Sequence, residues 1–239
     1  MLSVNQLTFK VKKKTLIDEL TLNVTPGSFY ALLGRKGSGK TTLLRLCSGL
    51  LEPQSGSICI NGMDALKREN KKNILRIFGY MGPQDGYFPR LQVMEYLEVY
   101  AHAQGLYGLA ARERCMEVLQ MGHLERRAEQ LVEEQSASVR RELSFLRAII
   151  HRPRLLLLDD PFNGMESAQK LAMEELFAIL AEDEVTVLMA SQSLPDAAHL
   201  CSEIGIIEKG RIISEGNLSD ILRQARSEAL LYLRVSVAP

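Results

Sequence analysis

The fold of this chain is decided by the stretch Gly34-Arg35-Lys36-Gly37-Ser38-Gly39-Lys40-Thr41, which Thr42 follows. The stretch matches the pattern G-x-x-x-x-G-K-[ST] at every fixed position. The apolar run Phe29 to Leu33 precedes it, as a buried strand would. Apolar residues at helical spacing follow it, namely Leu43, Leu46, Cys47 and Leu50. Strand, loop and helix therefore stand in the order that a phosphate-binding loop requires.

The residue types of this loop predict its chemistry. Backbone N–H groups and the positive end of the following helix would hold phosphates, Lys40 would reach the β- and γ-phosphates, and Thr41 would ligate Mg²⁺. A glycine-rich turn that contains a lysine by chance is the alternative, and the flanking patterns argue against it. The loop alone leaves kinases, GTPases and many ATPases open.

Length and composition fit an ordinary globular protein. The chain has 239 residues, of which 46% are apolar and 24% charged, so we expect one compact unit with a subdomain. Lysine and arginine total 29, as do aspartate and glutamate, and this balance gives no argument for capture of nucleic acid or anionic lipid. The sequence shows neither a run long enough to span a bilayer nor a signal-peptide pattern, so we expect a cytoplasmic protein. Four cysteines without C-x-x-C spacing predict reduced packing residues: Cys47, Cys59, Cys115 and Cys201.

Hydrophobic periodicity predicts an α/β fold with two kinds of strand. Alternating residues indicate two half-buried strands joined across Lys12-Lys13-Lys14: Leu7, Phe9 and Val11, then Leu20, Leu22 and Val24. Continuous apolar runs are typical of parallel strands covered on both faces: Phe29 to Leu33, Leu155 to Leu158, Val185 to Ala190 and Ile204 to Ile207. Helical patterns such as Met173, Leu176, Phe177 and Leu180 lie between them. We expect a parallel sheet with crossover helices and an antiparallel N-terminal layer.

One segment differs from this pattern. From about Tyr87 to Ile150 the chain is helical in pattern, with Val93, Tyr96, Leu97 and Tyr100 on one face. We interpret 87–150 as an inserted helical subdomain, 1–86 and 151–225 as a RecA-like core, and 226–239 as a tail too short for another domain. The whole chain is then one domain.

A second motif supports the phosphate-binding loop. Leu155 to Leu158 is an apolar run that ends in Asp159, with Asp160 and Pro161 next. A carboxylate in this position holds Mg²⁺ in P-loop enzymes. A chance leucine run before an aspartate is common, but its pairing with the loop favours the functional interpretation.

With both motifs, the chain resembles the nucleotide-binding cassette of ABC transporters over essentially its whole length. Phe78 to Gln84 resembles the strand that ends in the Q-loop, which makes Gln84 its catalytic and Mg²⁺-binding glutamine. Leu91 to Leu97 resembles the start of the helical subdomain, and Lys209 to Gly216 a family-like end of the sheet. The resemblance implies ATP and Mg²⁺ as ligands, with Thr41, Gln84 and Asp159 at the metal.

The resemblance also implies a head-to-tail dimer in which each ATP meets the other subunit's signature sequence, usually LSGGQ. Here the signature falls on Gln135 to Val139, and of its residues only Ser136 is kept. Ser136 can still donate to a γ-phosphate, and the helix behind it still offers N–H groups. Ala137 and Ser138 replace glycines and add Cβ atoms where the backbone should approach phosphate, so we expect weaker contact with the partner's nucleotide.

Further family positions are altered. The expected catalytic glutamate is Asp160, whose carboxylate is withdrawn by about 1.5 Å, one carbon–carbon bond. The switch histidine is Gln192, which can donate an N–H but cannot carry charge. The D-loop aspartate is Glu166. The adenine-stacking aromatic aligns with Val11, with Phe9 as a possible substitute or simply a core residue.

Three functions remain in view at this point. The leading one is the ATP-binding subunit of an ABC transporter with weak hydrolysis, peripheral at the cytoplasmic face of the membrane. It would work with a separate transmembrane permease and pair with a second cassette as a homo- or heterodimer. The second is a non-hydrolysing module that dimerises on ATP and regulates. The third, an ABC protein acting on nucleic acid or ribosomes, is disfavoured because such chains usually carry two cassettes or a long coiled-coil insertion.

Overall fold

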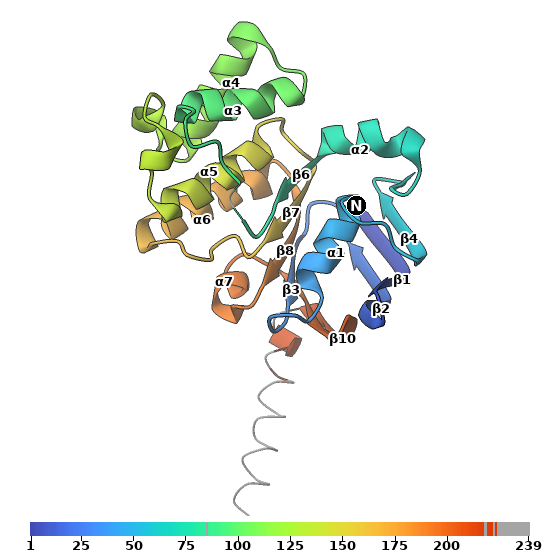
Figure 1. Cartoon of the computed structure of the whole chain (residues 1–239). Helices are drawn as coiled ribbons and strands as arrows, with labels where there is room; N and C mark the ends of the chain where they lie inside the picture. The colour runs from blue at the N-terminus through green and yellow to red at the C-terminus, as the bar shows by residue number, and fades with distance from the viewer. Residues whose placement is uncertain (85, 218, 222, 224–239) are drawn as a thin grey trace, which may run out of the picture.

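The computed structural model describes residues 1–84, 86–217, 219–221 and 223. Two sheets and a group of helices form the molecule (Figure 1). The six-stranded sheet has the order β10-β9-β3-β8-β7-β6, and the four-stranded sheet the order β2-β1-β4-β5. No helix in this part of the chain is long and apolar enough to cross a membrane.

The central sheet is parallel except at one edge. It consists of β3 (Phe29–Leu33), β6 (Phe78–Met81), β7 (Leu155–Asp159), β8 (Thr186–Ser191), β9 (Glu203–Glu208) and β10 (Arg211–Asn217). Only β10 runs antiparallel, next to β9. Every residue of β3, β7 and β8 is buried, which confirms the strands predicted from continuous apolar runs.

The antiparallel layer consists of β1 (Leu2–Val11), β2 (Lys14–Val24), β4 (Ser55–Ile60) and β5 (Met63–Asp64). The predicted hairpin is present, with its turn at Lys12 and Lys13. The first strand begins earlier than the alternation indicated, at Leu2. A register shift near Gln6, at φ 45°, changes which residues face the core, so Leu2 and Val4 are buried together with Leu7 and Phe9. Val11, at the end of the strand, is 46% exposed.

Helices fill the chain between β6 and β7. They are α3 (Val93–Ala103), α4 (Gly108–Met121) and α5 (Ala137–Ile149), with short 3₁₀ turns η2 (Glu125–Arg127) and η3 (Val132–Glu134) between α4 and α5. Figure 1 shows α3 and α4 at one end of the molecule and α5 beside α6 against the sheet. One apolar cluster runs from α3 and α4 through α5 to the sheet strands, so the helical insertion shares its core with the sheet.

The other helices connect the strands. They are α1 (Lys40–Cys47), the 3₁₀ turn η1 (Arg68–Asn70), α2 (Lys71–Ile77), α6 (Ser167–Glu182) and α7 (Leu194–Ala198). The four residues predicted to form the buried face of α6 are its four buried residues: Met173, Leu176, Phe177 and Leu180. The tail predicted over 226–239 lies outside the described residues.

The predicted helix after the phosphate-binding loop is shorter than its apolar spacing indicated. We expected Leu50 on its face, but α1 ends at Cys47 and Leu50 is 62% exposed. Gly49 adopts φ 72°, its N–H donates to the Leu46 carbonyl, and the Leu50 N–H donates to the Arg45 carbonyl. This pair of bonds is a Schellman motif, which ends a helix at a left-handed glycine.

Candidate functional site

The predicted site residues meet at the carboxyl ends of three neighbouring strands. The phosphate-binding loop follows β3, Asp159 ends β7, and Gln192 follows β8. Because β3, β8 and β7 are adjacent and parallel, these ends lie along one edge of the sheet. The edge of an open α/β sheet at its carboxyl ends is where such folds bind ligands.

The phosphate-binding loop needs its glycines. Gly37 and Gly39 adopt φ values of 82° and 118°, in the left-handed region that favours glycine. A Cβ on Gly34 would lie 2.5 Å from the Ile207 carbonyl oxygen and 2.6 Å from Ser38 Oγ, closer than atoms can approach. Helix α1 begins after Gly39 with no side-chain cap, so its positive end is open to an anion.

Main-chain hydrogen bonds hold this loop against the sheet. The Gly210 N–H, in the turn between β9 and β10, donates to the Ser38 carbonyl at 2.8 Å. The Asp18 N–H donates in turn to the Gly210 carbonyl at 3.0 Å, which ties in β2. The Gly34 N–H donates to the Ser191 carbonyl at 3.3 Å. The loop is therefore shaped before any ligand arrives.

Lys40 lies folded inside its own loop. It is only 5% exposed, and its Nζ donates to the Gly34 carbonyl at 2.6 Å and to the Arg35 carbonyl at 3.2 Å. Burial lowers the pKa of Lys40, while the carboxylates of Asp160 and Asp159 oppose this shift. An ammonium that already donates to loop carbonyls is well placed to donate to phosphate oxygens instead.

Asp159 is a buried carboxylate without a hydrogen bond. It is 1% exposed, and neither Oδ1 nor Oδ2 has a hydrogen bond of normal geometry among the described residues. Burial raises the pKa of Asp159, and nearby Thr41 acts in the opposite direction. An unpaired buried carboxylate is costly unless a cation joins it. The donor set of Thr41 and Asp159 thus fits Mg²⁺. Gln84 is exposed and, in the part of the chain that the structure describes, hydrogen-bonds to neither of them.

Asp160 and Gln192, the two residues at the predicted hydrolytic positions, are hydrogen-bonded to each other. Gln192 donates its backbone N–H to Asp160 Oδ1 and its side-chain Nε2 to Asp160 Oδ2, both at 3.2 Å. Asp160 adopts φ 47°, an unusual value for a residue with a side chain, and its N–H donates to the Ala190 carbonyl. Each carboxylate oxygen of Asp160 therefore accepts a hydrogen bond from within this subunit.

The signature residues differ from one another in exposure. Ser136 is the exposed N-cap of α5, and its Oγ accepts the Val139 N–H at 3.2 Å. Ala137 is also exposed, but Ser138 is 2% exposed. Ser138 Oγ accepts the Glu166 N–H at 2.9 Å and donates to Gln169 Oε1 at 3.1 Å. Its side chain is thus turned into its own subunit.

The predicted adenine contact lies on the surface at the end of β1. Val11 is 46% exposed, while Phe9 is 8% exposed and belongs to the core between the two sheets. Phe9 is therefore a packing residue in this structure, since a ring held in the core cannot stack on a ligand without leaving it. Val11 keeps the surface position that such a contact needs.

Three arginines of α5 take part in the site region and were not foreseen from the sequence. Arg141, which is 4% exposed, donates to the carbonyls of Gly82, Asp159 and Asp160. Arg147 Nη1 donates to the Gly86 carbonyl and to two tyrosine hydroxyls, and the Arg140 guanidinium lies 4.9 Å from the Tyr87 ring centroid. The only available signal was three arginines in an amphipathic helix, which ordinarily indicates a solvated face.

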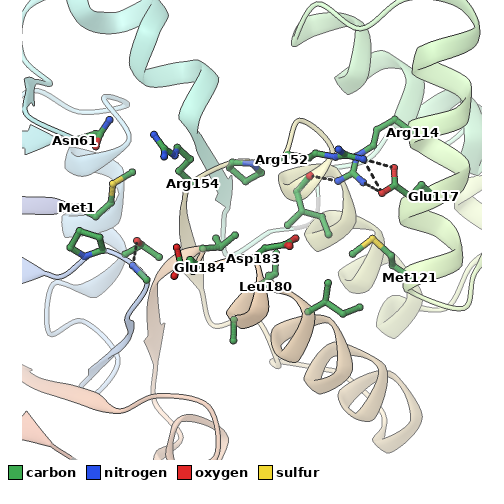
Figure 2. A pocket seen from close by; sticks show the side chains of 18 residues that line it. Met1, Asn61, Arg114, Glu117, Met121, Arg152, Arg154, Leu180, Asp183 and Glu184 are labelled. Carbon is green, nitrogen blue, oxygen red and sulfur yellow. Dashed lines mark hydrogen bonds and ion pairs between the residues drawn. The ribbon is translucent and has the colours of Figure 1, made fainter.

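A larger hollow lies at the other end of the sheet. It measures about 1290 Å³ and is bordered by residues that precede β3, β7 and β8. Figure 2 shows Glu117 there between Arg114 and Arg152, with Glu184 across the opening. None of the residues predicted to bind phosphate or Mg²⁺ lines it. The hollow beside Asp160 and Gln192 is much smaller, at about 110 Å³.

Comparison with known proteins points to one family. The family model described as ABC transporter matches residues 17–163. The bacitracin transport ATP-binding protein BcrA of Bacillus licheniformis is 33% identical over 216 residues, which are 90% of this chain and 69% of that protein. The ABC transporter ATP-binding protein NatA of Bacillus subtilis is 28% identical over 95% of this chain and 93% of its own length.

Solved structures give the same result for the fold. A structure described as the ATP binding subunit of an ABC transporter superposes with a TM-score of 0.86 at 26% identity, covering 99% of each chain. The cassette MJ0796, solved as a dimer bound to ADP and Pi, superposes with a TM-score of 0.82 at 24% identity over 91% of this chain and 99% of that one. At that identity the second match supports the fold alone.

Proposed function

The chain belongs to the ABC transporter family as an ATP-binding subunit, and from that premise we propose that it binds Mg²⁺-ATP and hydrolyses it slowly. One observation carries this proposal. In the free protein the Asp159 carboxylate has no hydrogen bond among the described residues and the start of α1 has no side-chain cap, whereas Asp160 and Gln192 are hydrogen-bonded to each other. Binding and turnover should therefore be separable in this chain.

Three groups would bind the nucleotide and its metal: Lys40, the uncapped start of α1 and the Asp159 carboxylate. Lys40 would exchange the Gly34 and Arg35 carbonyls for phosphate oxygens, and the uncapped start of α1 would accept the remaining charge. Thr41 and Asp159 would hold Mg²⁺, with Gln84 joining once its loop moves toward the site. The metal would neutralise charge on the phosphates. The buried Asp159 carboxylate would gain the partner that it lacks.

Slow hydrolysis follows from the state of Asp160. A base that activates water needs an oxygen within hydrogen-bond reach of that water, and an oxygen that already accepts another hydrogen bond is a weaker acceptor. Both oxygens of Asp160 accept from Gln192, and an aspartate side chain is one carbon shorter than a glutamate. Gln192 cannot add positive charge at the γ-phosphate, as a protonated histidine would. A shortfall near 1 Å in such an arrangement lowers rates by roughly a hundredfold.

The subunit would work at the cytoplasmic face of a membrane, bound to a separate permease and to a second cassette. The segment after Gln84 is a candidate for the permease contact, because Tyr87 and Phe88 are 39% and 49% exposed. Arg140 and Arg147 of α5 hold this segment through Tyr87 and Gly86. A pull on the segment would therefore reach the helix that carries the signature residues.

The test compares binding with turnover in the same preparation. Calorimetry at millimolar ATP should detect Mg²⁺-dependent binding to the purified chain, and phosphate release should stay below one turnover per second. Homodimers that hydrolyse tens of ATP per second, a rate normal for a competent enzyme, would contradict the proposal. Absence of any nucleotide binding would contradict its binding half as well.

A second function, a regulatory module that dimerises on ATP without hydrolysis, is favoured by the mutual binding of Asp160 and Gln192. Turnover measured with the permease and a second, intact cassette separates the two. A transporter subunit should gain turnover in that complex, whereas a purely regulatory module should leave the rate at that of the intact cassette alone.

A further inference from the structure

Two side chains on one face of α5 connect the start of that helix to three other segments of the site. Ser138 and Arg141 are three positions apart and are 2% and 4% exposed, so they lie together on the buried face of the helix. Neither side chain has a part in the proposed binding and hydrolysis of ATP. Their hydrogen bonds indicate a joint role.

Ser138 joins the start of α5 to the start of α6. Its hydroxyl accepts the N–H of Glu166 and donates to Gln169, so one oxygen acts as both acceptor and donor. Glu166 is the N-cap residue of α6, and that helix has no side-chain cap of its own. Ser138 therefore fixes the segment that runs from Asp160 into α6.

Arg141 joins α5 to the ends of β6 and β7. Its Nη1 donates to the Gly82 carbonyl at 2.8 Å, two residues before Gln84. Its Nη2 donates to the carbonyls of Asp159 at 2.5 Å and Asp160 at 2.9 Å. Hydrogen bonds from a charged donor are about twice as strong as neutral ones. One guanidinium thus holds the main chain of Asp159, the proposed Mg²⁺ ligand, and of the residue after it.

We propose that Ser138 and Arg141 form a cis staple, which holds Asp159, Asp160 and Glu166 in register with the signature helix of the same subunit. Ser138, at the position where the resemblance implied a glycine facing the partner's nucleotide, serves its own subunit instead. Arg141 is a positioning residue, since it contacts main-chain carbonyls and acts on the metal site through them. The inference rests on the proposed function, because Mg²⁺-ATP is the ligand whose site the staple orders.

The first test measures how nucleotide binding depends on Mg²⁺. In Arg141→Gln, the Mg²⁺ concentration for half-maximal ATP binding should rise about tenfold. Loss of a group that orients a metal ligand lowers metal affinity by about tenfold to a hundredfold, and Arg141 acts only through the main chain. Binding of ATP in EDTA should not change, because the phosphate-binding loop does not contact Arg141 through any of these bonds. A merely structural role would lower the melting temperature and leave the Mg²⁺ dependence as in the parent.

Arg114→Gln is the matched control. Arg114 is another arginine that binds main-chain carbonyls, and it does so at the opposite end of α5, donating to Ile150 at 2.8 Å and Ile149 at 3.0 Å. Its loss should destabilise the same helix without altering the Mg²⁺ dependence. An equal shift in both variants would overturn the positioning role.

The second test needs no ligand. Hydrogen exchange of the Glu166 amide should accelerate at least tenfold in Ser138→Ala. This variant removes a single oxygen, so it still tests the staple if Arg141→Gln does not fold. Parental exchange at Glu166, or parental Mg²⁺ dependence in Arg141→Gln, would refute the staple. If the parent itself binds no nucleotide, the proposed function fails while the exchange result still decides the inference.

Discussion

The binding half of the site and its hydrolytic half differ in how their polar groups are satisfied in the free protein. In the binding half, Asp159 has no hydrogen-bond partner among the described residues, and α1 has no side-chain cap. In the hydrolytic half, Asp160 is paired with Gln192, and Ser138 with Glu166 and Gln169. Unpaired buried groups are stabilised when a ligand supplies their hydrogen-bond partner. Paired groups must first break a hydrogen bond that they already have. This contrast is the reason for the proposal that the chain binds ATP and hydrolyses it slowly.

The largest effect should come from breaking the binding half. Lys40→Ala removes the cation that reaches the phosphates, and each hydrogen bond to a charged group contributes about 1.5 to 3 kcal/mol. We expect affinity for Mg²⁺-ATP to fall by at least about a hundredfold, measured by calorimetry. Lys13→Ala, an exposed lysine in the turn between β1 and β2, is the control and should bind as the parent does. Unaltered binding in Lys40→Ala would mean that the loop is not the nucleotide site.

The next largest effect should be a rise in ATPase rate when the altered residues of the hydrolytic half are restored. Asp160→Glu with Gln192→His restores reach and charge, and Ala137→Gly with Ser138→Gly restores backbone approach across the dimer. Each pair alone should raise the steady-state ATPase rate by only a few fold. The quadruple variant should exceed the product of the two gains by about tenfold, because the two sets complete one composite site.

The same variants also separate the role of Ser138 in the cis staple from its effect on contact across the dimer. Ser138→Gly deletes the bonds to Glu166 and Gln169, so the glycine pair should be less stable than the parent even where it helps turnover. A melting-temperature series on the same four proteins checks this. Rate gains that simply multiply would show that the two halves do not form one site. An unchanged rate in the quadruple variant would show that other residues limit turnover.

Glu142 tests whether an unpaired buried group always marks a ligand site. It is 1% exposed, its Oε1 has no hydrogen-bond partner among the described residues, and it lies one residue beyond Arg141 on α5. Burial raises the pKa of Glu142 to about 7, while the charges of His123 and Arg127 act against the rise. No phosphate-binding group adjoins it, so we expect it to be a cost to folding and nothing more.

The pH dependence follows from that pKa. The folded value lies above the ordinary value of 4.5, so the folded chain holds a proton that the unfolded chain releases. Glu142 does not lower the free energy of unfolding below pH 4.5, where both states hold the proton. That free energy falls as the pH rises through about 7. Glu142→Gln should therefore be more stable than the parent at pH 8 by about 2 kcal/mol and no more stable at pH 4. Urea unfolding at both pH values measures it, and an equal difference at the two would refute the assignment.

The sequence was a good guide wherever a pattern reflects the backbone. The glycines of the phosphate-binding loop, the four core residues of α6 and the buried strands β3, β7 and β8 all lie as predicted, since spacing and burial determine them. Its errors were local. The register shift near Gln6 added Leu2 and Val4 to the buried face of β1, Val11 at the end of that strand is exposed, and the left-handed Gly49 ended α1 before Leu50.

Side-chain pairing was beyond the sequence. The spacing of Asp160 and Gln192 along the chain says nothing of their hydrogen bonds, which arise because β7 and β8 are neighbours. Arg141 could not be told from a solvated arginine, because its three carbonyl partners come from two separate strand ends. Roles that depend on tertiary contacts among polar groups are therefore the part that required the structure.

The smallest effect concerns the edge of the binding half. Val11 is 46% exposed at the end of β1, where a stacking ring would meet adenine, and an aromatic pair adds about 0.5 to 1.5 kcal/mol beyond its buried area. Val11→Tyr should therefore tighten ATP binding by about threefold to tenfold, while inorganic triphosphate, which has no base, should bind as it does to the parent. Val11→Leu, which adds apolar area without a ring, is the control and should gain less. If tyrosine tightened both ligands equally, Val11 would lie outside the adenine contact, and the base would have to be held by another surface residue.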